Sequence, residues 1–266
     1  MDSTIHSLTP DLQLFPVILV QPFPLMKLPL NIRNRIYSLL LTVPAMICMS
    51  VDGTKFNMSM FRFTNIALLR VSKKVYFETK AIMYSTNIFD IVPPSTELSP
   101  STDYRVCLFP RGCQGLVQKL TIRVRSLYML QYLMNGAYAH IKNAYRGLQK
   151  LTLILELETT TRGFGKLWAK NEGEASDVYV HRLHAKMSAE LYGYRGTPKT
   201  IPTWITLRVL FDGERYDEVS EPANGAQIGN QASDNDPDED EAEDARRADL
   251  KKGVFQAFEM FKKGAR

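Results

Sequence analysis

The chain has 266 residues, 45% hydrophobic and 23% charged, so it carries enough apolar side chains for the core of one or two folded domains. No run of 18 apolar residues occurs, and Pro16, Pro22 and Pro24 break up the apolar stretch 12–20 and its surroundings. We therefore expect neither a membrane span nor a signal peptide, and a location in the cytoplasm or nucleus.

Charge is distributed unevenly around the net value of +5. Residues 231–266 carry 7 Lys and Arg against 10 Asp and Glu, which leaves 26 against 18 in residues 1–230. A basic body of this kind can bind nucleic acid. Here the basic residues are scattered through predicted helices and do not cluster with aromatic residues, so we do not expect nucleic-acid binding.

The first predicted element is a short amphipathic helix over residues 28–41. Pro29 suits the first helical position, where its missing N–H costs nothing. Ile32, Ile36, Leu39 and Val43 follow at helical spacing until Pro44 ends the pattern.

A second helix is predicted to begin near residue 64. Leu68, Val71, Val75 and Ile82 share one stripe, and the positions between them include the polar pair at 73–74. This helix leads into a short strand, which we place at 88–92.

These two helices and the strand resemble the F-box-like domains of an abundant protein family of filamentous fungi. The signature of that family is a Leu-Pro helix ending in Ile-Tyr-x-Leu-Leu-Leu, then Leu-Leu-Arg-Val-x-(Lys/Arg)-x-(Ile/Val)-Tyr and Tyr-x-x-Asn-x-Phe. The matching segments are Ile36–Leu41, Leu68–Tyr76 and Tyr84–Phe89, within a module that spans residues 23–92. Asn31 stands where an acidic residue is usual, and residues 43–63 separate the helices.

The resemblance implies a protein-interaction function, with the module docking a Skp-type adaptor of a cullin ubiquitin ligase and the later half recruiting a substrate protein. The residues that it implies for partner binding are Pro29, Ile32, Ile36, Leu68, Leu69 and Val71. The alternative is that the chain is a structural α/β interaction domain with no ubiquitin-ligase association. An exposed apolar face on the 28–41 helix would favour the first reading, because monomers seldom leave such a face bare.

The later half begins after a Pro- and Ser-rich linker at 92–102 and contains a repeat. Leu116–Val124 is echoed by Leu148–Leu155 at an offset of 31 residues, and each copy ends in a β-rich run. Helices are predicted over 127–144 and 177–194, and a third strand over 203–211.

The sum of these elements is a small β-α-β-α-β sheet region over 103–217, for which parallel strands and right-handed crossovers are the default. In this arrangement we expect Leu120 and Leu151 to be equivalent buried residues. The Leu-x-x-Leu-x-Leu spacing is also similar to leucine-rich repeats, although their Asn or Cys position is missing.

The C-terminal region divides into two parts. Residues 218–245 hold an acidic run with few apolar residues, for which we predict a disordered linker. Residues 246–263 form a predicted amphipathic helix with Leu250, Val254, Phe258 and Phe261 on one side. We expect it to fold back on the body, the alternative being a partner groove or a membrane surface, and Gly253 costs it about 1 kcal/mol.

Catalytic patterns are sparse. His181 and His184 share a helix face but lack a third ligand, and the Gly-Phe-Gly-Lys run at 163–166 lacks the spacing of a phosphate loop and is predicted to be a plain loop. Cys107 and Cys113, with Cys48, are odd in number and have no identifiable base, so we expect free, mostly buried thiols. We therefore predict no enzymatic activity, metal or cofactor.

The fold class predicted from the sequence is α/β, or α+β when the whole chain is considered. It comprises an N-terminal F-box-like helical module, the β-α-β-α-β region, a disordered acidic tail and a C-terminal helix.

Overall fold

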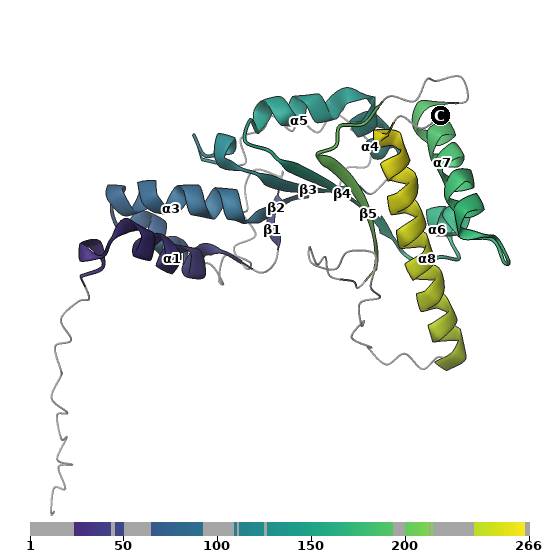
Figure 1. Cartoon of the computed structure of the whole chain (residues 1–266), viewed down its shortest axis with the longest axis horizontal. Coiled ribbons are helices and arrows are strands. Elements are labelled where there is room, and N and C mark those ends of the chain that lie inside the picture. Colours follow the sequence, from purple (N-terminus) through teal and green to yellow (C-terminus); the bar gives the residue numbers. More distant parts are fainter. Residues whose placement is uncertain are drawn as a thin grey trace, which may run out of the picture.

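The computed structural model describes residues 24–43, 46–50, 65–92, 109–110, 112–124, 127–193, 200–212, 214 and 237–263. For residues 46–50, 92 and 237–240 it describes the backbone only. The fold is mixed α/β, as predicted (Figure 1).

A five-stranded sheet forms the centre of the molecule, and its strands lie side by side in the order in which they occur along the chain. Every neighbouring pair is parallel. The strands are β1 (Met46–Ser50), β2 (Ile88–Val92), β3 (Lys119–Val124), β4 (Lys150–Leu157) and β5 (Ile205–Phe211). The four predicted strands are confirmed, whereas β1 lies within the stretch that separates the predicted helices and was not foreseen.

The repeat seen in the sequence is a true structural repeat. Lys119 pairs with Lys150 and Leu120 with Leu151, and both leucines are almost fully buried, as expected for equivalent positions. The same offset extends one strand further back, because Ile88 pairs with Lys119. Since β2 belongs to the N-terminal module and β3 to the later half, the sheet is continuous across the predicted linker.

The two faces of the sheet differ in chemistry. One face is apolar on β2, β3, β4 and β5, and its residues join one core with the helices that connect the strands; Figure 1 shows α4 and α5 along this side of the sheet. The other face carries polar residues on β2, β3 and β4. There Arg123 bridges two strands, with Nε 2.7 Å from Asp90 Oδ2 and Nη1 2.5 Å from Glu156 Oε1.

Two of the connecting helices follow the predictions with one interruption. The predicted helix over 127–144 is divided into α4 (Leu127–Tyr132), a π-helical turn (Leu133–Ala137) and α5 (Tyr138–Ala144). Gly136 makes this break possible, because its φ of 123° is a backbone conformation that residues with a side chain rarely adopt. The second predicted helix is α7 (Ser176–Tyr192), which ends at Gly193 with a φ of 75°.

The predicted loop at 163–166 is wrong, because these residues form helix α6 (Gly163–Trp168). Its two glycines are poor helix formers and concealed it in the sequence. A residue with a side chain does not fit at Gly165, because a Cβ atom at this position would lie 1.8 Å from the Thr159 carbonyl oxygen. The helix is held by its last residue, since Trp168 is buried and donates its ring N–H to Glu190.

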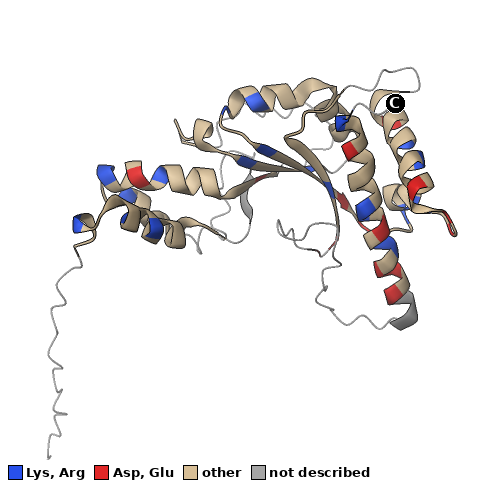
Figure 2. Ribbon diagram, in the orientation of Figure 1, with Lys and Arg blue, Asp and Glu red and all other residues tan. Residues whose placement is uncertain are grey.

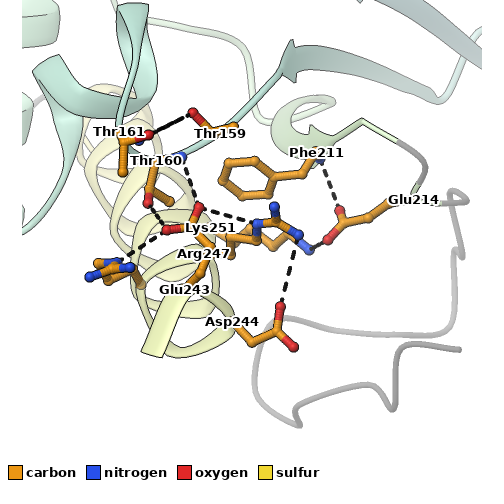
Figure 3. A network of polar contacts seen from close by, with 10 residues as sticks. Thr159, Thr160, Thr161, Phe211, Glu214, Glu243, Asp244, Arg247 and Lys251 are labelled. Carbon is orange, nitrogen blue, oxygen red and sulfur yellow. Dashed lines mark hydrogen bonds and ion pairs between the residues drawn. The ribbon is translucent and has the colours of Figure 1, made fainter. Parts of the chain in front are cut away.

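The predicted disorder of residues 218–245 is wrong in its last part, because helix α8 (Pro237–Lys262) begins within the acidic run. Residues 218–236 lie outside the described residues. Proline suits a first helical position, and carboxylates near a helix N-terminus are favoured by the helix dipole. Glu243 also has a tertiary partner, Thr160, whose backbone N–H and hydroxyl both donate to it (Figure 3).

The rest of α8 folds back on the body, as predicted. Leu250, Val254, Phe258 and Phe261 are all buried, and the helix packs against α7 and β5. Gly253 belongs to the same contact: a Cβ atom there would lie 2.3 Å from the ring of Tyr179, whose hydroxyl donates to the Trp168 carbonyl. The glycine that weakens the isolated helix therefore allows α8 to approach α7.

We predict that Gly253→Ala lowers the free energy of unfolding by about 1–3 kcal/mol, because the added methyl group must displace a buried tyrosine ring. Helix propensity alone predicts the opposite sign, a gain of about 1 kcal/mol. Chemical denaturation distinguishes the two, with Ala248→Gly at an exposed position of α8 as the control, expected to cost about 1 kcal/mol. A stabilised Gly253→Ala variant would show that the two helices do not pack this closely.

Candidate protein-binding surface

Helices α1 (Leu30–Leu41) and α3 (Lys73–Thr86) form a pair whose contact is polar at its centre. The Arg33 guanidinium meets the Glu78 carboxylate in two places, with Nε 2.9 Å from Oε2 and Nη2 2.7 Å from Oε1. Arg33 also donates to the Leu28 carbonyl, and the Tyr37 hydroxyl donates to Glu78 at 3.1 Å. The hydrogen bonds from Arg33 lower the pKa of Glu78, so the pair is ionised at neutral pH.

The C-terminal ends of both helices are held by one buried side chain, Asn87. Its Nδ2 donates to the carbonyls of Leu41 and Met83, at 2.9 and 2.8 Å, and its Oδ1 accepts from the Val43 N–H at 2.8 Å. Backbone groups of α1, α3 and the segment leading to β1 are thereby satisfied by one amide. Asn87 directly precedes β2, so the same residue fixes the helix pair to the edge region of the sheet.

Helix α1 turns its apolar stripe to the solvent. Its buried residues are Arg33, Tyr37 and Leu41, spaced by four. Of the predicted stripe, Ile32 is 43% and Leu39 78% exposed, Ile36 is half-buried, and Val43, beyond the end of the helix, is half-buried against the core. Leu40, beside the stripe, is 37% exposed. The amphipathic pattern predicted from the sequence is therefore present, but it faces outward.

Other exposed apolar residues occur on α1, on α3 and on the segments that adjoin these helices. Among the described residues, seven of the ten large hydrophobic side chains that are exposed belong to this part of the chain. We call the set the α1/α3 surface: Met26, Leu30, Ile32, Leu39, Leu40, Val71 and Phe77. Exposure on this scale in one part of a protein is typical of a surface that binds another molecule.

The residues predicted to bind a partner divide into two groups. Pro29, Ile32 and Val71 are exposed and Ile36 is half-buried, so all four can be reached from outside.

Leu68 and Leu69 lie in the 3₁₀ turn Ile66–Arg70 and are half-buried against the core. Leu39, Leu40 and Phe77 are absent from the partner-binding residues predicted from the sequence, although all three are exposed. Phe77 is 63% exposed, and the signal that could have found it is its place two positions after Val75, away from the stripe that α3 buries.

Basic residues dominate the same segments (Figure 2). Residues 24–43 and 65–92 hold seven Lys and Arg but only two carboxylates, Glu78 and Asp90. Both carboxylates accept hydrogen bonds from arginines, Glu78 from Arg33 and Asp90 from Arg123. Lys80 lies over the Phe77 ring, 4.5 Å from its centroid.

The other candidate sites considered in the sequence do not assemble. His184 is buried and packs on Phe261, with ring centroids 4.3 Å apart, and burial lowers its pKa. Among the described residues no group of three or more potential metal ligands occurs. Cys113 is buried, with its Sγ 3.6 Å from the Tyr76 hydroxyl, whereas Cys107 lies outside the described residues.

Comparisons with protein-family models, with curated proteins and with solved structures find no match to this chain. None of the described helices has both the length and the hydropathy needed to cross a bilayer.

We predict that Asn87→Ala lowers the free energy of unfolding by about 1–3 kcal/mol, because it leaves two buried carbonyls and one N–H without their shared partner. Asn143→Ala is the control, since Asn143 is exposed on α5, and it should change stability by less than about 0.5 kcal/mol. Equal effects in urea denaturation would show that Asn87 does not hold the helix ends.

Proposed function

We propose that this chain is a non-enzymatic protein-interaction protein and that its α1/α3 surface docks a Skp-type adaptor of a cullin ubiquitin ligase in the cytoplasm or nucleus. The observation that carries the proposal is the outward-facing aliphatic stripe of α1. A helix that buries an arginine and a tyrosine and leaves Leu39 78% exposed has the reverse of the usual arrangement. Such a stripe is accounted for when a partner covers it.

The local design of the helix pair supports this reading. The contact between α1 and α3 is already filled by Arg33, Glu78 and Tyr37, so the aliphatic side chains are not needed to hold the helices together. Burying one Leu or Ile side chain contributes about 1.5–3 kcal/mol relative to leaving it exposed. A partner that covers the stripe gains this free energy as binding affinity. A few such anchors usually dominate the affinity of a protein interface.

The repeat over β2, β3 and β4 supports the second part of the proposal, recruitment of a substrate protein by the later half. Parallel strands that follow one another in chain order, with the same 31-residue offset between paired positions, are typical of repeat architectures. Such architectures offer extended surfaces for protein partners.

A second candidate is a structural α/β interaction domain without ubiquitin-ligase association. The observation that favours it is the continuity of the sheet, because β2 follows directly from α3 and pairs with β3. The helix pair is thus built into the same body as the later half. In this case the α1/α3 surface binds a protein of another kind.

The test is the binding of the purified chain to a recombinant Skp-family protein, measured by calorimetry together with thermal unfolding of each variant. We expect binding at micromolar concentration and a loss of more than about 2 kcal/mol in Ile32→Asp, because an unpaired carboxylate enters a desolvated patch. Val178→Asp is the matched control, since Val178 is 55% exposed on α7. No binding by the wild type, or full binding by a folded Ile32→Asp variant, would contradict the adaptor function and leave the second candidate.

A further inference from the structure

Six basic side chains lie on the segments that carry the α1/α3 surface, and these segments hold only two carboxylates. Besides Arg33, which is buried against Glu78, residues 24–43 and 65–92 hold the following cations: Lys27, Arg35, Arg70, Lys73, Lys74 and Lys80. All are exposed except Lys80, which is half-buried. Together with Arg33 the two segments hold seven cations against two carboxylates, Glu78 and Asp90, which gives them a net charge of +5.

These cations are interleaved with the exposed apolar residues along the chain. On α1, Arg35 lies three residues after Ile32 and four before Leu39, which places the three within reach of one another on the helix surface. Arg70 directly precedes the exposed Val71, and Lys73 and Lys74 occupy the first turn of α3. A partner that covers the apolar residues therefore comes close to the positive charges.

We propose that the partner bound by the α1/α3 surface is an acidic protein, whose carboxylates surround an apolar centre. This inference rests on the proposed function, because it assumes that the surface docks a protein. Complementary charge at the rim of an interface raises the association rate and selects against basic partners, while the apolar centre supplies most of the affinity. Without such carboxylates, closing the interface would bring the cations together unopposed.

The acidic run of this same chain does not fill that role within one molecule. Its described part, residues 241–244, belongs to α8, which packs on β5 and α7. The helix pair lies beyond β1 and β2, at the other end of the sheet (Figure 1). The part of the acidic run that the structure describes therefore does not supply the charge complement, and we assign that role to another molecule.

An anionic membrane also attracts cations beside apolar residues, but the arrangement favours a protein. A membrane-surface helix carries its Lys and Arg on the polar face opposite an apolar one. On α1 the side opposite the stripe is packed on α3 through Arg33 and Tyr37, and Arg35 is its one exposed cation. The remaining cations lie on three other segments, as in a shaped protein interface.

The test uses the full-length chain and the double charge reversal Lys73→Glu/Lys74→Glu. Both positions lie in the first turn of α3, where carboxylates are favoured by the helix dipole, so the variant should fold. The matched control is Arg162→Glu/Lys166→Glu, two exposed cations at α6. Binding to the Skp-family probe is followed by calorimetry and stopped flow between about 0.05 and 0.5 M salt.

We expect the charge reversal to weaken binding at least tenfold at low salt, mainly through the association rate, while the α6 control binds as the wild type does. The wild-type affinity should fall with salt, and that of the charge reversal should fall much less. Ile32→Asp should weaken binding at every salt concentration and keep the salt dependence.

The other outcomes separate this inference from the proposed function. If Ile32→Asp weakens binding but charge reversal and salt do not, the acidic partner is wrong and adaptor docking stands. If the probe does not bind, whereas vesicles of phosphatidylcholine and phosphatidylserine do and charge reversal releases them, both proposals are wrong and the surface binds membranes. A dimer in light scattering that charge reversal dissociates would assign the surface to a second copy and overturn the inference.

Discussion

The ion pair between Arg33 and Glu78 determines which side of α1 packs on α3 and which side faces the solvent. A charged group is buried in a protein only when it is paired and hydrogen-bonded, and Arg33 meets that condition through two contacts with Glu78 and one with the Leu28 carbonyl. Tyr37 adds a fourth bond to the same carboxylate. Since one side of α1 must face this network, its aliphatic stripe faces elsewhere. Ion pairs of this kind are weak sources of stability, and we infer that this one specifies orientation.

The helix pair is attached to the rest of the molecule through the sheet. Asn87 satisfies the ends of both helices immediately before β2, and β2 then pairs with β3 in the register that the next strand repeats. At the far edge, α8 covers β5 and is anchored through Glu243 to Thr160. The α1/α3 surface and the capped edge therefore lie at opposite ends of one parallel sheet. A protein bound at the first end leaves the other accessible.

Much of the fold could be predicted from the sequence because the strands place an apolar residue at every second position, and the 31-residue repeat shows this pattern in both β3 and β4. Elements that depend on distant partners were missed. Strand β1 is fixed by pairing with β2, 42 residues later, and the start of α8 by a contact across 83 residues. Helix α6 is concealed by glycines that are needed for close packing at Thr159.

The candidate surface could be predicted only in part. The period of apolar residues identified α1 as amphipathic, but a period does not say which side faces the core. That choice was made by Glu78, 45 residues from Arg33 along the chain, and no local pattern indicates it. Phe77 was missed although the sequence holds a signal for it, because it lies two positions after Val75 and off the stripe that α3 buries.

The stability of two leucine variants tests which side of α1 faces the core. Leu39 is 78% exposed and Leu41 is fully buried, although they are two residues apart on one helix. Urea denaturation of Leu39→Asn should change the free energy of unfolding by less than about 1 kcal/mol, whereas Leu41→Asn should cost about 3 kcal/mol or more. Equal losses, or a larger loss at Leu39, would show that the aliphatic stripe faces the core and would remove the basis for the α1/α3 surface.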